Sequence, residues 1–81
     1  MARIVRKARF PRLRDLRETE LGWDVSELAA KLPAGKPSVA SLYRLEQGKS
    51  IRVTSARRVF EVVNAALGGK LDVKKELVIE K

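Results

Sequence analysis

The strongest constraint on the fold of this chain is a pair of short amphipathic segments, residues 26–32 and 38–49, separated by a stretch that cannot be helical throughout. That stretch, residues 33–37, contains two prolines and a glycine, which interrupt helices and favour a turn. In the second segment, Leu42 and Leu45 lie three residues apart and so share one side of a helix. The pattern predicts two helices joined by a turn, with the polar side of the second helix turned outward.

Capping residues indicate where the helices begin and end. Asp24 and Glu27 have the spacing of a capping box, in which each side chain accepts a hydrogen bond from the other residue's backbone amide. Ser38 suits the N-cap of the next helix, which ends at Gly48. Thr54 is expected to cap a last helix. The predicted helices span residues 11–21, 25–32, 38–48 and 55–67.

The C-terminal tail can be interpreted in two ways. Leu77, Val78 and Ile79 form a short apolar, partly β-branched run that favours a strand, whereas Val73 and Leu77 would also pair on a helix. We expect the strand. The fold class is therefore mainly α, a small helical bundle with a short C-terminal β-strand. The expected division is a basic N-terminal arm (1–10, flexible or a short strand), a helical domain (11–69) and the tail (70–81).

The positive charge of the chain is clustered. The net charge is +8 and the pI is about 10.5, with the excess of bases concentrated in residues 1–17 and 36–58. Clustered bases favour binding to a polyanion such as nucleic acid, and a solvated basic surface is the alternative.

Several classes of function are excluded by the residues that the chain lacks. It contains neither cysteine nor histidine, so disulfides, zinc fingers and Ser/His or Cys/His catalysis are not expected. We therefore expect no enzyme, no metal site and no cofactor. No apolar run is long enough for a membrane span and no export signal is evident, so we expect a cytoplasmic protein that lies on the nucleoid when bound to DNA.

Three motifs carry a family resemblance. They are Leu13-Arg14-x-Leu16-Arg17, Asp24-x-x-Glu27-Leu28-Ala29 and Ser38-x-x-Ser41-Leu42-x-Arg44-Leu45-Glu46-x-Gly48-Lys49, and Val63-Asn64-Ala65-Ala66-Leu67-Gly68 also fits. In their order and spacing, residues 13–68 resemble the lambda-repressor-like, Cro/C1-type helix-turn-helix family. The resemblance implies a helix-turn-helix fold whose third helix reads DNA in the major groove. Glu46 is expected to pair with Arg14 or Arg17.

The resemblance also implies which residues contact DNA. Base contacts are expected from the outer side of the third helix, at Val39, Ala40, Tyr43 and Arg44. Arg44 is the best candidate because a guanidinium can bond O6 and N7 of guanine together. Backbone contacts are expected from the ends of that helix, from the turn before it and from the basic arm, at Ser38, Ser41, Lys36, Lys49, Arg52, Arg3, Arg6 and Lys7.

The chain departs from the family pattern in three places. The turn before the third helix is about three residues longer than usual, and Val25 stands where the family often has a phosphate-binding glutamine. The tail lacks the usual fifth-helix signature. Some antitoxin-type members of the superfamily dimerise through a C-terminal strand, so Leu77, Val78 and Ile79 are expected to form a ribbon between two copies. A frayed tail is the alternative.

These features predict a dimeric transcriptional regulator, most simply a repressor, that binds a near-palindromic operator on double-stranded DNA. A second class is an antitoxin or anti-activator that uses the same fold to bind a protein partner, a toxin or an activator. A third is an architectural or excision-type DNA-binding factor of a mobile element.

Overall fold

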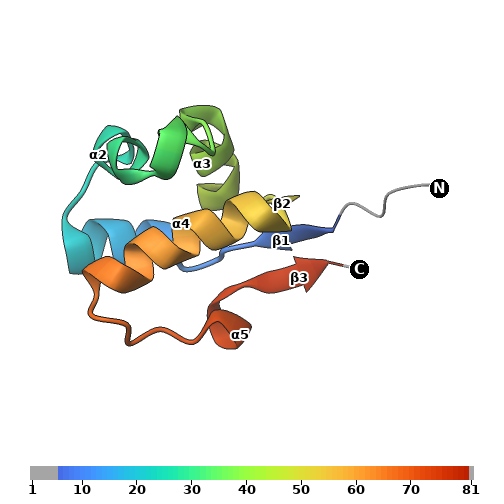
Figure 1. Ribbon diagram of the computed structural model, residues 1–81. Coiled ribbons are helices and arrows are strands. Elements are labelled where there is room, and N and C mark those ends of the chain that lie inside the picture. Colours follow the sequence, from blue (N-terminus) through green and yellow to red (C-terminus); the bar gives the residue numbers. More distant parts are fainter. Residues whose placement is uncertain (1–5, 81) are drawn as a thin grey trace.

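Helices form most of the molecule, and three short strands form one antiparallel sheet, so the expected mainly helical class is confirmed (Figure 1). The structure is a computed structural model that describes residues 6–80. In chain order its elements are β1 (Lys7–Arg9), α1 (Leu13–Asp15), the π-helix η1 (Leu16–Leu21), α2 (Val25–Lys31), the 3-10 helix η2 (Pro33–Gly35), α3 (Val39–Glu46), β2 (Ile51–Arg52), α4 (Val53–Ala66), α5 (Val73–Glu76) and β3 (Val78–Glu80).

The first helix of the bundle widens halfway along. α1 runs directly into the π-helix η1, which ends where the Gly22 amide donates to the carbonyl of Arg17. This wider turn brings Leu21, five residues after Leu16, back toward the core. Gly22 then takes a left-handed conformation with φ of 65°, which glycine adopts without steric cost. The predicted helix over 11–21 is correct except for its first turn.

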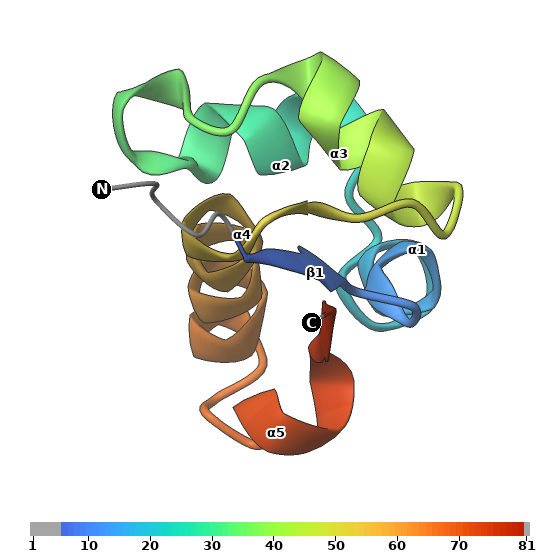
Figure 2. The same cartoon turned by 90° about the vertical axis from the view of Figure 1, so that its right-hand side faces the viewer.

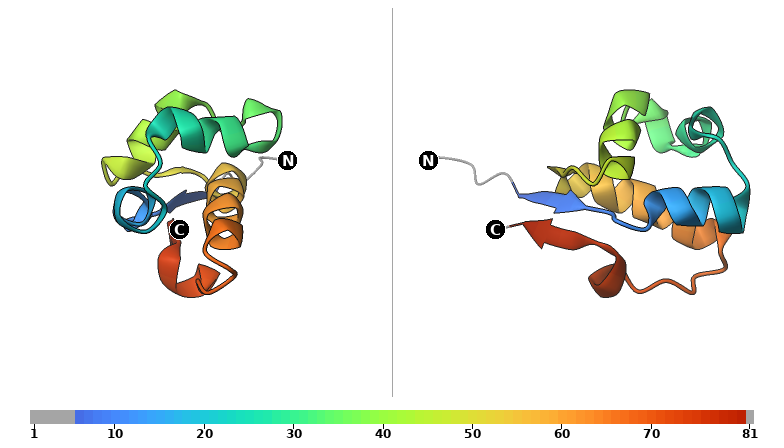
Figure 3. Two further views of the ribbon diagram at one scale, coloured as in Figure 1. Left: turned by 90° about the vertical axis from the view of Figure 1, so that its left-hand side faces the viewer. Right: turned by 180° about the vertical axis from the view of Figure 1, so that it is seen from behind.

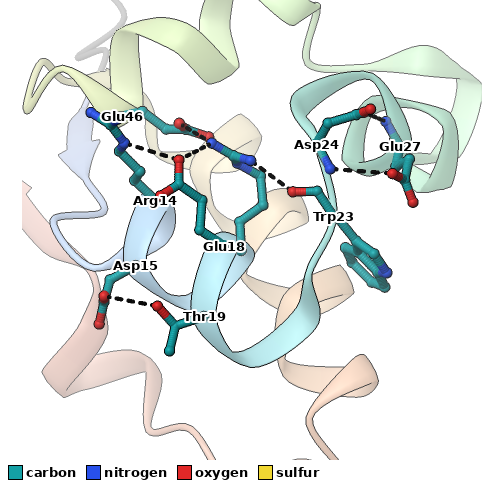
Figure 4. Close-up of polar contacts among 9 residues, drawn as sticks. Arg14, Asp15, Glu18, Thr19, Trp23, Asp24, Glu27 and Glu46 are labelled. Carbon is teal, nitrogen blue, oxygen red and sulfur yellow. Dashed lines mark hydrogen bonds and ion pairs between the residues drawn. The ribbon is translucent and has the colours of Figure 1, made fainter.

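Capping chemistry begins α2 and α3 as predicted. The Glu27 amide donates to Oδ1 of Asp24 at 2.7 Å, and the Asp24 amide donates to Oε1 of Glu27 at 3.4 Å. Both bonds are drawn in Figure 4. Ser38 caps α3 by accepting from the Ser41 amide at 3.4 Å. The short η2 fills the proline-rich connection between the two helices.

α4 begins earlier than predicted. Its first residue is Val53, and Thr54 lies inside the helix rather than at its cap. The reason is tertiary: β2 leads straight into the helix, and the Val53 amide donates to the carbonyl of Arg6 at 3.0 Å. A distant backbone group therefore satisfies an amide that a side-chain cap would otherwise satisfy.

The basic arm and the tail meet in the sheet, whose strand order is β2-β1-β3. β1 is the central strand and pairs antiparallel with both neighbours, Ala8 lying opposite Ile51 on one side and Ile79 on the other. β1 and β3 run side by side in the right-hand view of Figure 3. Of the two expectations for the arm, the structure contains the short strand.

The expected short C-terminal strand is confirmed as β3, but it begins only at Val78, and a helical turn precedes it. Asp72 accepts from the Lys74 amide at 3.0 Å and begins the one-turn helix α5, after which the chain extends as β3. The turn buries Glu76 and Leu77, which are 7% and 4% exposed. A strand through Val73 would have kept the whole tail extended.

The core lies where the helices meet one face of the sheet. Phe10 contacts Phe60 of α4 with ring centroids 6.0 Å apart. α2 and α3 lie together on one side of α4 and the sheet, and α5 lies on the other side (Figure 2). The largest fully buried side chains come from α1, η1, α2, α3 and α4 and from the residue that follows β1: Phe10, Leu13, Leu16, Leu28, Leu42, Leu45, Val59 and Val63.

Candidate nucleic-acid interface

α3 presents one buried and one exposed side. Leu42 and Leu45 are 0% and 1% exposed, whereas Val39 and Tyr43 are 39% and 52% exposed. Ala40 and Arg44 are also exposed. The four residues predicted to contact bases therefore all face solvent. Because Val39 and Tyr43 are four residues apart, they lie one turn apart on the same side of the helix.

A buried ion pair fixes the end of α3 against η1. Arg17 donates from Nε and Nη2 to the two carboxylate oxygens of Glu46 at 2.7 and 2.8 Å, and each side chain is only 8% exposed. A third bond runs from Nη1 of Arg17 to the carbonyl of Trp23 at 2.7 Å. These bonds to Glu46 and Trp23 are drawn in Figure 4. Of the two arginines predicted to pair with Glu46, Arg17 is the partner, and Arg14 pairs with Glu18 at 3.2 Å instead.

This arrangement keeps Arg17 charged. Its hydrogen bonds to Glu46 raise the pKa of the guanidinium above its ordinary value, although burial alone would lower it. A bidentate pair of this kind restricts both side chains to one geometry. The exposed side of α3 is therefore held in a defined orientation relative to the rest of the molecule.

A basic depression of about 280 Å³ lies beside the exposed side of α3. β1, α3, β2 and the first turn of α4 all contribute to it. Among residues 6–80, three cationic side chains, three hydroxyls and one apolar side chain line it, and no carboxylate does: Lys7, Arg44, Arg52, Ser41, Ser50, Ser55 and Ile51. A concave site of this composition suits a phosphate or another oxyanion, because it offers both charge and hydrogen-bond donors.

The register of the sheet explains this clustering. Lys7 and Arg52 are direct partners in the β1–β2 pair, and both lie on the outer side of the strands, while Ala8 and Ile51 point into the core. The N-terminal end of α4, which carries a partial positive charge, begins at the same place. Residues about 45 positions apart in the chain thus reach one depression.

Four residues predicted to contact DNA meet in this depression: Lys7, Ser41, Arg44 and Arg52. Lys36, Ser38 and Lys49 are exposed but do not line it, and Arg6 contributes its carbonyl to the start of α4. Arg3 lies outside the described residues.

Sequence reasoning missed Ser50 and Ser55. Both lie within three residues of Arg52 in the sequence. Ser55 falls in the first turn of α4 only because that helix begins at Val53. A sequence signal existed, because small hydroxyl residues lie at positions 50, 54 and 55, on both sides of Arg52. It was overlooked because the last helix was predicted to begin two residues later than it does.

The opposite flank of α3 has a different character. Tyr43 and Gln47 line a second depression of about 290 Å³ in which arginines and carboxylates are balanced, the other lining residues being Arg14, Arg17, Glu18, Val25 and Glu46. A polyanion would therefore be attracted to one flank of α3 much more strongly than to the other.

The residues predicted to pair two copies of the chain differ in exposure. Val78 and Ile79 are 38% and 41% exposed on β3, an edge strand of the sheet. Leu77 is buried in the core of its own chain, so the structure leaves it unavailable to a second copy.

Comparisons of the chain with protein-family models, with curated proteins and with solved structures gave no match. Within residues 6–80, no cluster of three or more histidine, cysteine or acidic side chains could hold a metal ion. The helices of that region are all too short or too polar to pass through a bilayer.

Proposed function

We propose that this protein is a sequence-specific DNA-binding regulator of the helix-turn-helix type, resembling the Cro/C1-type family, that inserts α3 into the major groove. One observation carries the proposal: the basic depression formed by Lys7, Arg44 and Arg52 directly adjoins the exposed side of α3. A helix that enters the major groove brings its flanks close to the phosphates that border the groove. The depression would hold one of these phosphates while the outer residues of α3 meet base edges.

The lack of carboxylates in the depression supports this function over a structural role for the charges. Ion pairs that merely stabilise a surface bring opposite charges together, as Arg14 and Glu18 do. Lys7, Arg44 and Arg52 are instead gathered without a counter-charge among the lining residues. Such a site attracts an anion from outside the molecule.

The first test is a salt titration of binding to double-stranded DNA. Arg52→Ala is expected to reduce the slope of log K against log salt by about one, because each phosphate contact releases condensed counterions. Arg58→Ala is the matched control, since this exposed α4 arginine does not line the depression and should leave the slope unchanged. Equal slopes for the parent protein and the two variants would exclude the depression as a phosphate site.

A second test separates base contact from phosphate contact at Arg44, which both lies on the outer side of α3 and lines the depression. A preferred site is first selected from random DNA. Arg44→Ala is expected to weaken binding to that site by about 1–3 kcal/mol and to relax the preference for its guanine. An equal loss on random DNA would assign Arg44 to the phosphate instead. Failure to select any site would remove sequence specificity from the proposal.

A homodimer is part of the same proposal. The sheet ends at β3, where Val78 and Ile79 are half exposed, and a second β3 could extend the sheet across a two-fold axis. Two α3 helices about 34 Å apart would then match a near-palindromic operator. Sedimentation equilibrium tests this directly. A monomer at every concentration, with and without DNA, would exclude it.

The exposed apolar residues of β3 also favour a second candidate, an antitoxin or anti-activator that binds a toxin or an activator. A Val78→Lys variant distinguishes the two candidate functions. Loss of a co-purifying protein with intact DNA binding would support the second, because Val78 does not line the basic depression.

A further inference from the structure

One row of apolar side chains, which lie opposite one another on the three strands, is only partly covered by α4. The register aligns Ile51, Ala8 and Ile79 across β2, β1 and β3. α4 packs against β1 and β2, and the first two residues of the row are 8% and 0% exposed. Ile79 is 41% exposed although it occupies the same row. α4 therefore shields Ile51 and Ala8 from solvent but leaves Ile79 on β3 partly exposed.

An apolar groove of about 290 Å³ lies at this uncovered end. Its apolar residues, Val73, Leu77 and Ile79, come from α5 and β3, and its cationic residues, Arg57 and Lys74, come from α4 and α5. It lies between α4 and the α5–β3 segment, which occupies the opposite side of α4 from α3 in Figure 2. None of the lining residues belongs to the basic depression beside α3.

The two cations of the groove are available to a ligand. Among residues 6–80, neither Arg57 nor Lys74 forms an ion pair. The nearby Glu76 does not line the groove, and its Oε2 accepts from Nη1 of Arg12 at 2.8 Å. Asp72 uses its carboxylate to cap α5 at the Lys74 amide.

We propose that this groove binds a small carboxylate with an apolar body, such as the anion of a medium-chain fatty acid. A guanidinium binds a carboxylate in a bidentate fashion, and an alkyl chain would cover Val73, Leu77 and Ile79. The volume lies near the lower end of the range of ligand sites, about 300–1,000 Å³, which favours a small ligand. The two rim cations disfavour a second copy of this groove as the occupant, because like charges would then face each other. The proposal does not rest on DNA binding.

The test is a titration of the ¹⁵N-labelled full chain, followed by the backbone amide resonances. Sodium octanoate is the probe, sodium acetate lacks the apolar body, and 1-octanol lacks the charge. Octanoate is expected to cause saturable shifts at Val73, Leu77, Ile79 and Arg57. Acetate and octanol are expected to cause much smaller shifts at those residues. Equal binding of octanol, or octanoate shifts centred on Lys7, Arg44 and Arg52, would overturn the proposal.

Two variants complete the test. Arg57→Gln is expected to weaken octanoate binding about tenfold, as the loss of one charge-assisted contact implies. Arg58→Gln is the matched control, because Arg58 is the adjacent exposed arginine and does not line the groove. Both positions are exposed, so both variants should fold, which the same spectra report. An equal loss of affinity in the two variants would show that octanoate binding depends only on the overall charge of the protein, which would overturn the proposal.

Discussion

Two arginine–glutamate pairs with a buried carboxylate join distant parts of this chain, and they differ in how completely the hydrogen-bonding groups of the carboxylate are satisfied. Arg17 and Glu46 are both 8% exposed in their side chains, and both carboxylate oxygens of Glu46 accept hydrogen bonds from Arg17. In the second pair, the side chain of Glu76 is 8% exposed but that of Arg12 is 57% exposed, and Oε1 of Glu76 has no hydrogen-bond partner among residues 6–80. The first pair fixes α3, and the second joins α5 to the residues just before α1.

The comparison predicts that the pair with both members buried holds its elements more firmly than the pair with one exposed member. A fully bonded buried pair is costly to break, because the remaining charge is left without water or a partner. In the second pair, the exposed Arg12 can exchange its bond for water at little cost, and only the buried Glu76 loses a partner. We therefore expect α3 to depend on its ion pair, and the tail to depend mainly on apolar packing at Leu77.

The largest effect is expected from Glu46→Leu. Removing the carboxylate leaves the buried Arg17 guanidinium without its main partner, so the free energy of unfolding should fall by about 3–5 kcal/mol. Urea denaturation followed by circular dichroism measures this. The double variant Arg17→Met/Glu46→Leu should recover most of the loss, because no uncompensated charge remains. A single variant within about 1 kcal/mol of the parent would refute the importance of the pair.

An intermediate effect is expected from Leu77→Ala. Leu77 is 4% exposed but borders the open groove, so the cost should be about 2–4 kcal/mol, at the lower end of the range for buried leucines. The same denaturation experiment measures it, and Ile79→Ala, at a position that is 41% exposed, is the control with a smaller expected loss. Equal small losses at both positions would mean that the tail is frayed in solution.

The smallest effect is expected from Glu76→Gln. The amide oxygen can still accept from Arg12, and an uncharged NH2 group replaces the unpaired carboxylate oxygen, so the buried negative charge disappears while one polar group stays unpaired. Stability should change by less than about 1 kcal/mol in either direction. Differential scanning calorimetry can detect a change of this size as a shift in Tm. A loss comparable to that of Glu46→Leu would remove the distinction between the two pairs.

The helices were the most predictable part of the molecule. The capping box at Asp24, the Ser38 cap and the stop at Gly22 depend on contacts within a few residues, so the local sequence contains them. The errors occurred where a distant group replaced a local one. α4 begins at Val53 because a carbonyl of Arg6 accepts its first amide.

The exposed side of α3 was predictable for the same reason, since Leu42 and Leu45 mark its buried side. The basic depression was predictable only in part. Lys7, Ser41, Arg44 and Arg52 could each be suspected as a DNA contact, but their meeting at one place depends on the pairing of β1 with β2. Ser50 and Ser55 follow from that pairing and from the start of α4.

The amino-acid sequence by itself determined the periodicity of the helices, their caps, the clustered positive charge and the absence of cysteine and histidine chemistry. The tertiary structure alone decided that Arg17 rather than Arg14 binds Glu46, that Glu76 binds Arg12 and that the tail returns to pair with β1 of the same chain. The physical reason is sequence separation. Capping and periodicity act over three or four residues, whereas these two ion pairs join residues 29 and 64 positions apart, whose meeting depends on how the whole core packs.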